Sequence, residues 1–173
     1  AGRPHDCDAL LDQNFSLEGE RRHSATVPGR CRLMIGPRHA LLRPEFAQLR
    51  RARRARTGVR RIFAFFGGTD PSDMTGRTLE ALSCGEFGDL ELQIVIGANY
   101  GQRGTLEARA KARPRTRLHR ASASVAALMA ESDLAFGAGG GTTWERMCVG
   151  LPTILVSVAE NQASACRDLA AAG

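Results

Sequence analysis

The sequence predicts an α/β fold, a Rossmann-like parallel sheet with helices on both faces, and two observations support this prediction. From Arg61 to Gly173, five short apolar runs alternate with five helix-like segments. The runs are nearly continuous in apolar residues, which is typical of strands buried on both faces. Strands separated by helices in this way pair in parallel.

The expected elements of this domain can be placed in order along the chain. A regular domain is expected over residues 60–173, after a less regular segment, 1–59. The expected strands are 61–66, 90–97, 115–120, 133–139 and 151–159, and the expected helices are 74–84, 105–112, 122–132, 142–150 and 161–173.

The segment 1–59 carries weaker signals. Residues 7–15 and 31–36 contain strand candidates, and the polar stretch 16–30 between them is expected to be a surface loop. Beyond Pro44 the chain can form a basic helix. Ala1 is not an initiator methionine, and the chain stops after a helix pattern where another strand is expected. We therefore expect a piece of a longer protein.

The composition is that of a soluble globular protein, with 43% hydrophobic and 24% charged residues. No apolar run approaches the roughly 20 residues that a membrane span needs. No charged leader with an apolar core and a cleavage site opens the chain, so we expect a cytoplasmic protein. The five cysteines are widely spaced, without a Cys-x-x-Cys pair, and are expected to be small buried residues.

The net charge of +6 comes from 23 arginines and one lysine. Much of the excess lies in the stretch LRRARRARTGVRR, residues 49–61. A basic patch can bind nucleic acid, but no aromatic residue interleaves these arginines and no nucleic-acid-binding motif surrounds them. The stretch is expected to be a solvated helix or an inter-domain linker, and nucleic acid is not the expected partner.

Polar or glycine-rich residues follow every expected strand of the domain. In parallel sheets, ligands bind beyond the carboxyl ends of the strands, and these ends share one edge. The sequence therefore predicts a ligand site built from GGTD (67–70), GANYG (97–101), HRAS (119–122), GAGGGTT (137–143) and AENQ (159–162).

The loop 137–143 matches neither common phosphate motif. No Lys-Ser/Thr pair follows its glycines, and Thr142 stands where a Gly-x-Gly-x-x-Gly motif needs its third glycine. Glycines still allow close backbone approach, and the following helix start offers N–H groups to a phosphate. A tight strand-to-helix turn explains the same residues, and both interpretations stay open at this point.

The role of the Glu145 side chain also has two interpretations. Thr142 and Glu145 have the spacing of a capping box, in which the carboxylate returns to the helix start. Alternatively, Thr143 caps the helix and Glu145 accepts hydrogen bonds from a ribose diol. Trp144, the single tryptophan, is expected in the core.

The other candidate residues at this edge can also have either a ligand-binding or a purely structural role. Gly67, Gly68 and Thr69 can approach a phosphate or sugar, or can form a turn in which Ser72 or Asp73 caps the next helix. Asn161 and Gln162 can donate to phosphate or sugar oxygens, or cap the last helix. His119 stands alone without a Ser/Asp partner pattern and is expected to be structural.

Two ordered stretches carry a family resemblance, FGGTDPSDMT (66–75) and the run from HRAS to AENQ (119–162). With LLDQNF (10–15) and LMIGPRHALLRPEF (33–46), they resemble the UDP-sugar hydrolases of pseudaminic acid biosynthesis. Those enzymes release a 2,4-diacetamido-2,4,6-trideoxy-altrose from UDP. The chain is more distantly similar to the UDP-N-acetylglucosamine transferase of peptidoglycan synthesis, which has the same two-domain GT-B architecture.

The resemblance implies that the domain 60–173 is the nucleotide-binding C-terminal domain of a GT-B fold, and that residues 1–59 are the end of the N-terminal domain and the linker. The implied partner is UDP or a UDP-sugar. The sequence shows no metal-binding cluster, and neither a metal nor a cofactor is expected. The resemblance also implies a role for each candidate residue. The diphosphate would contact Gly139, Gly140, Gly141 and Thr142, and the ribose would contact Glu145. The uracil would contact the backbone around Leu118, His119 and Arg120, the phosphate or sugar would contact Asn161 and Gln162, and the cleft would be lined by Gly67, Gly68 and Thr69.

The catalytic histidine of that family lies in an N-terminal Gly-x-Gly-His loop, which does not occur in these 173 residues. The catalytic residue is therefore expected outside this chain, which should be inactive alone. In the family reaction that histidine is the base for water attack, and UDP departs. The alternatives are a GT-B glycosyltransferase with a UDP-sugar donor and a non-enzymatic nucleic-acid-binding module.

Overall fold

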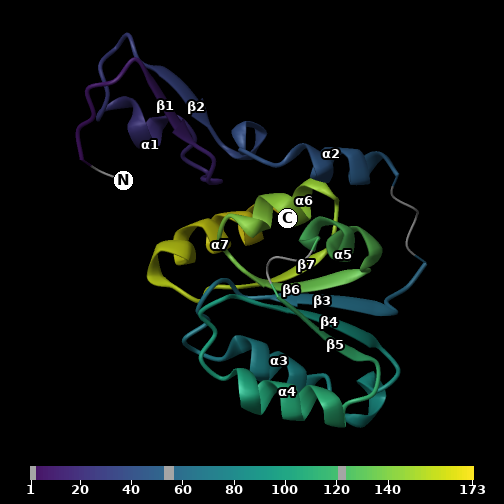
Figure 1. Ribbon diagram of the computed structural model, residues 1–173. Coiled ribbons are helices and arrows are strands. Elements are labelled where there is room, and N and C mark those ends of the chain that lie inside the picture. The colour runs from purple at the N-terminus through teal and green to yellow at the C-terminus, as the bar shows by residue number, and fades with distance from the viewer. Residues whose placement is uncertain (1–2, 53–56, 121–123) are drawn as a thin grey trace. The chain divides into compact units, whose positions relative to one another are not determined.

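The computed structural model describes residues 3–52, 57–120 and 124–173 (Figure 1). The chain divides into two compact units, which are described one at a time. The larger unit is Arg43–Glu160, and the smaller unit joins Ala1–Leu42 to Asn161–Gly173.

The larger unit is built on a five-stranded sheet in which every pairing is parallel. The strand order is β5-β4-β3-β6-β7, so the chain moves outward in one direction from β3 and then returns to the other side of β3. This confirms the predicted α/β class. The strands are β3 (Arg61–Phe65), β4 (Glu91–Ile96), β5 (Thr116–Arg120), β6 (Leu134–Ala138) and β7 (Thr153–Val156).

Helices cover both faces of this sheet, as Figure 1 shows. One face carries α3 (Met74–Ala81), α4 (Arg103–Ala112) and the short turn η2 (Gly85–Phe87), and the other carries α2 (Pro44–Arg51), α5 (Val125–Glu131) and α6 (Thr142–Cys148).

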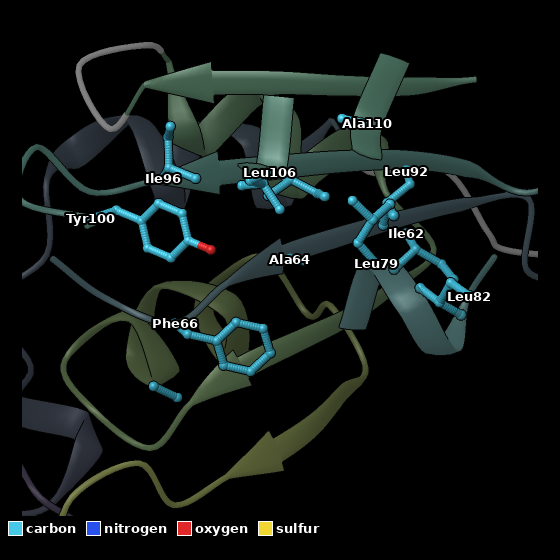
Figure 2. Packing of buried hydrophobic residues seen from close by; sticks show 12 residues of the cluster. Ile62, Ala64, Phe66, Leu79, Leu82, Leu92, Ile96, Tyr100, Leu106 and Ala110 are labelled. Atoms are coloured by element: carbon cyan, nitrogen blue, oxygen red, sulfur yellow. The ribbon is translucent and has the colours of Figure 1, made fainter. Parts of the chain in front are cut away.

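Each face has its own hydrophobic core because successive side chains of a strand point to opposite faces. On the α3 and α4 face, Ile62 of β3 packs with Leu79, Leu92 and Leu106 (Figure 2). On the opposite face, Phe63 is buried in a second cluster, whose other members are Phe46, Val95, Val125, Ala126, Met129, Ala135, Val149 and Leu151.

Helix α2 belongs to the larger unit, although the sequence placed it in the segment before the domain. Its Phe46 is fully buried in the same core as Phe63, and the helix packs on α5 and α6. The compact units therefore follow other boundaries than the expected segments 1–59 and 60–173. That domain assignment stays a prediction for the longer protein.

The smaller unit contains the two expected strands of the N-terminal segment, paired in parallel. The expected surface loop 16–30 is wrong in part, because it contains a helical turn whose His23 is buried and meets the Asp12 carboxylate at 2.9 Å. The elements of this unit are β1 (Ala9–Asp12), α1 (Arg21–Ser24), β2 (Arg32–Ile35), η1 (Pro37–His39) and α7 (Glu160–Ala172).

The cysteines differ from expectation, since none of the five is fully buried and Cys84 is exposed. The sulfur atoms of Cys7 and Cys31 lie 3.6 Å apart. Within the described ranges, no helix is long and apolar enough to cross a membrane. The same residues contain no cluster of three histidine, cysteine or acidic side chains that could hold a metal ion.

Candidate functional site

The strand register brings the glycine-rich loops to one edge of the sheet. Phe65 of β3 lies opposite Gly137 of β6, so Gly67 and Gly139 follow their strands at the same level. Ala64 lies opposite Ile94 of β4, which places the end of β4 at this edge too. The predicted shared edge is confirmed for the ends of strands β3 to β7. Residues 121 and 122 of the predicted loop 119–122 lie outside the described part of the chain.

The strand order singles out two of these loops. The chain reverses direction across the sheet between β3 and β6, which are neighbours. In open α/β sheets the crevice at such a switch point is where ligands bind. The loops 67–70 and 139–141 flank this point, so both lie where a ligand of this fold is expected.

The loop after β3 is held by two aspartates. Asp70 is buried, and its carboxylate accepts hydrogen bonds from Met74 N (3.0 Å), Thr75 N (2.8 Å) and Thr75 Oγ1 (2.6 Å). Asp73 accepts from Gly76 N at 3.0 Å and from the Tyr100 hydroxyl. This confirms Asp73 as a cap of α3 and assigns Asp70 to the same task.

We expect Asp70→Ala to lower the free energy of unfolding by about 2–3 kcal/mol, because the buried N–H groups at the start of α3 lose their acceptor. Urea unfolding followed by circular dichroism measures this. The exposed Asp89, replaced in the same way, is the control and should change stability by less than about 0.5 kcal/mol. Equal stabilities for the two variants would contradict the capping role.

With these aspartates engaged in the helix start, the tip of the loop is formed by small residues. Gly67 has a backbone φ of 100°, a conformation that favours glycine. Gly68 and Thr69 are exposed. The tip therefore offers backbone to a ligand.

The loop after β4 packs directly on the loop after β3. A Cβ atom at Gly97 would overlap the carbonyl oxygen and the Cα atom of Gly68. Together with the Tyr100–Asp73 hydrogen bond, this close approach makes the two loops one unit.

Arg146 hydrogen-bonds both sides of the loop 139–141, which is called the glycine loop below. The sequence patterns did not predict a role for this arginine. Its side chain is fully buried, and its guanidinium donates to Ala138 O (2.8 Å), Thr142 Oγ1 (3.0 Å) and Thr143 Oγ1 (3.2 Å). Neither threonine caps α6, whose N-cap residue Gly141 makes no side-chain cap bond. Both predicted caps are therefore wrong, because α6 begins at Thr142 and both threonines lie inside the helix, where their hydroxyls accept from Arg146.

Glu145 is not the partner of a capping box. Its carboxylate is half-buried and makes no hydrogen bond to a described residue. Burial raises the pKa of this carboxyl, while the charges of Arg43 and Arg146 act in the opposite direction. A half-buried carboxylate beside two arginines can accept hydrogen bonds from a ligand's hydroxyl groups. Trp144 is 3% exposed, which confirms its predicted place in the core.

The residues of β5 contribute in a different way. Leu118 packs against the core of the α3 and α4 face. The His119 ring meets the side chain of Gln93 at 2.7 Å, so this histidine is structural, as expected, and only its backbone is a candidate for ligand contact.

Stability should depend on His119 below neutral pH. Burial, and then the charge of Arg117, lowers the pKa of His119, so the folded state binds a proton less readily than the unfolded chain. The contribution of the neutral His119 ring to the free energy of unfolding is complete above the pKa of the unfolded chain, near 6.5. That contribution is lost as the pH falls below this value. We expect wild type to lose more stability than His119→Gln between pH 7.5 and 5.5 in urea titrations. Equal losses would show that His119 does not cause the pH dependence.

Asn161 and Gln162 begin α7 and belong to the smaller unit, so their predicted contact with phosphate or sugar stays a prediction. In the arginine-rich stretch 49–61, the first residues end α2, and residues 53–56 lie outside the described part of the chain. Arg50 donates to Cys148 O at 3.3 Å, and Arg61 pairs with Glu91 at 2.7 Å. These two arginines are therefore engaged within the protein.

The parallel sheet with helices on both faces defines a Rossmann-like α/β fold. The crystal structure of Acinetobacter baumannii MurG matches this chain with a TM-score of 0.55 and 18% sequence identity. The match covers 86% of this chain and 42% of that chain. The predicted MurG-like, GT-B type of fold is thereby confirmed.

Two proteins are similar in sequence. The spore coat polysaccharide biosynthesis protein SpsG of Bacillus subtilis is 26% identical over 167 residues, 96% of this chain and 48% of that protein. The uncharacterized protein MJ1062 of Methanocaldococcus jannaschii is 26% identical over 155 residues, 86% of this chain and 32% of that protein. The chain thus spans half or less of the length of these relatives. No family model matches the chain.

Proposed function

We propose that this chain is the UDP-binding portion of a nucleotide-sugar hydrolase, which releases a diacetamido-trideoxy sugar from UDP in the cytoplasm during pseudaminic acid or other surface-polysaccharide biosynthesis. One observation carries the proposal. The glycine loop and the turn after β3 flank the switch point of a MurG-like sheet, in a chain similar to a polysaccharide biosynthesis protein.

The parts of UDP are assigned to this edge as follows. The diphosphate meets the loop from Gly139 to Thr142, where the N–H groups of Gly140 and Gly141 donate no hydrogen bond to the described residues. The ribose diol meets Glu145, and the uracil meets the backbone at Leu118 and His119. The turn from Gly67 to Thr69 lines the cleft.

The position of Glu145 supports the ribose assignment. It lies one helical turn after the glycine loop, on the helix that this loop begins. A carboxylate accepts both hydroxyls of a diol, whereas the loop provides donors for the phosphates. The Glu145 carboxylate is thus an acceptor for the ribose, next to the loop N–H groups that are donors for the adjoining diphosphate.

In this proposal the chain holds the leaving group, and the base that activates water lies outside it. Water adds to the sugar and UDP departs with its negative charge. Loop N–H groups that are already oriented stabilise that charge without reorganisation.

Binding of UDP tests the proposal. We expect a calorimetric titration of the 173-residue protein with UDP to show saturable heat, and a titration with ADP to show none because the uracil contact is lost. A folded protein without heat at millimolar UDP would contradict the proposal.

A GT-B glycosyltransferase is the second candidate, since the solved structure that matches is MurG. The longer protein, incubated with a UDP-sugar in ¹⁸O-labelled water, separates the two. Labelled free sugar formed without an acceptor supports the hydrolase, whereas UDP release that requires an acceptor supports the transferase.

A further inference from the structure

Arg146 is the largest fully buried side chain of the described protein, and a buried guanidinium is costly unless its N–H groups are satisfied. Its donors reach both ends of the glycine loop. Nη2 binds the Ala138 carbonyl oxygen at 2.8 Å, before the loop, and Nη1 binds Thr142 Oγ1 at 3.0 Å, after the loop. Nη2 also reaches Thr143 Oγ1 at 3.2 Å.

The neighbouring strand is shaped to admit this guanidinium. A Cβ atom on Gly137 would overlap Nη1 and Cζ of Arg146. Gly137 is itself in the ladder, opposite Phe65, so a larger residue there cannot move aside without disturbing the sheet. The glycine at this position therefore leaves room for Arg146. Beyond it, the N–H groups of Gly140 and Gly141 donate to no described residue.

We infer that Arg146 is a positioning residue for the diphosphate. It fixes the glycine loop in the arrangement that receives the two phosphates and places a permanent positive charge directly behind it. This inference rests on the proposed function, because the ligand is the diphosphate of UDP.

The planar fork of arginine suits this task better than lysine. The guanidinium directs Nη1 and Nη2 to different acceptors at once, in a fixed planar geometry. Lysine keeps the charge but cannot bind Ala138 and Thr142 in the same geometry. Arg146→Lys thus separates the loop geometry from the charge.

The experiment compares UDP with uridine, which lacks the phosphates and does not use the glycine loop. Dissociation constants for both ligands are measured by calorimetry on wild type, Arg146→Lys and Gly137→Ala. The exposed Arg77 on α3, replaced by lysine, is the control. Thermal unfolding of each variant identifies any that do not fold.

We expect Arg146→Lys to weaken UDP binding about tenfold and to leave uridine binding unchanged. Gly137→Ala should act in the same direction, because its new methyl group displaces the guanidinium. Arg77→Lys should bind both ligands as wild type does. An unchanged ratio of UDP to uridine affinity in folded Arg146→Lys would overturn the inference, and so would a parallel loss of both affinities.

Inorganic pyrophosphate separates this inference from the proposed function. If wild type binds no UDP, the proposed function fails. The amide signals of Gly140 and Gly141 are then followed by NMR during addition of pyrophosphate. Shifts in wild type that are absent in Arg146→Lys would uphold the role of Arg146, whereas no shift in wild type would overturn it.

Discussion

Gly97→Ala is expected to lower the free energy of unfolding by about 3 kcal/mol. The added methyl group would overlap the carbonyl oxygen and the Cα atom of Gly68, and neither can rotate away as a side chain could. Overpacking of this kind typically costs about 1–3 kcal/mol, and a backbone partner places the change at the upper end. Urea unfolding of wild type and of Gly97→Ala measures the difference in the free energy of unfolding.

Gly101→Ala is the matched control for Gly97→Ala. Gly101 follows the same strand, and a Cβ atom there would meet no heavy atom within 4 Å. We expect Gly101→Ala to change the free energy of unfolding by less than about 0.5 kcal/mol. A Gly97→Ala protein as stable as this control would show that the loops after β3 and β4 are not packed as described.

Glu145→Ala is expected to weaken UDP binding about 10- to 100-fold while leaving the fold intact. A hydrogen bond to a charged group contributes about 1.5–3 kcal/mol, and the half-buried carboxylate has no hydrogen bond to a described residue to lose. Calorimetric titration with UDP measures the effect. Burial raises the pKa of the Glu145 carboxyl, so the carboxylate is protonated earlier as the pH is lowered. The loss of UDP affinity on acidification should therefore begin at a higher pH than the pKa of an ordinary glutamate would give.

Glu107→Ala is the control for Glu145→Ala, since Glu107 is an exposed glutamate of α4 on the opposite face of the sheet. It should bind UDP as wild type does. If the two variants bind UDP equally tightly, Glu145 does not hold the ribose.

The sheet could be predicted from the sequence because its signal is local. Each strand is a short apolar run, and buried parallel strands need no other pattern. The place of α2 could not be predicted in this way. Its Phe46 meets Phe63 and Val95 only in the folded protein, and no short stretch of sequence contains that contact.

The candidate site shows the same division. The glycines of the edge loops could be found from their positions after the strands. The start of α6 could not be predicted from the spacing of Thr142 and Glu145, which matches a capping box. The helix begins at Thr142 itself, and the threonine hydroxyls accept from Arg146. The spacing of Thr142 and Arg146, four residues apart on a helix, together with the small Gly137, was the available signal.

The edge of the sheet as a UDP site is tested most directly by NMR of the ¹⁵N-labelled protein during addition of UDP. We predict the largest shifts at the amides of Gly139, Gly140 and Gly141, with smaller shifts at Gly67 and Gly68. The signal of Gly88, which lies before β4 at the other edge of the sheet, should stay in place. An unchanged spectrum at millimolar UDP, or shifts that leave the glycine loop unaffected, would contradict a nucleotide site at this edge.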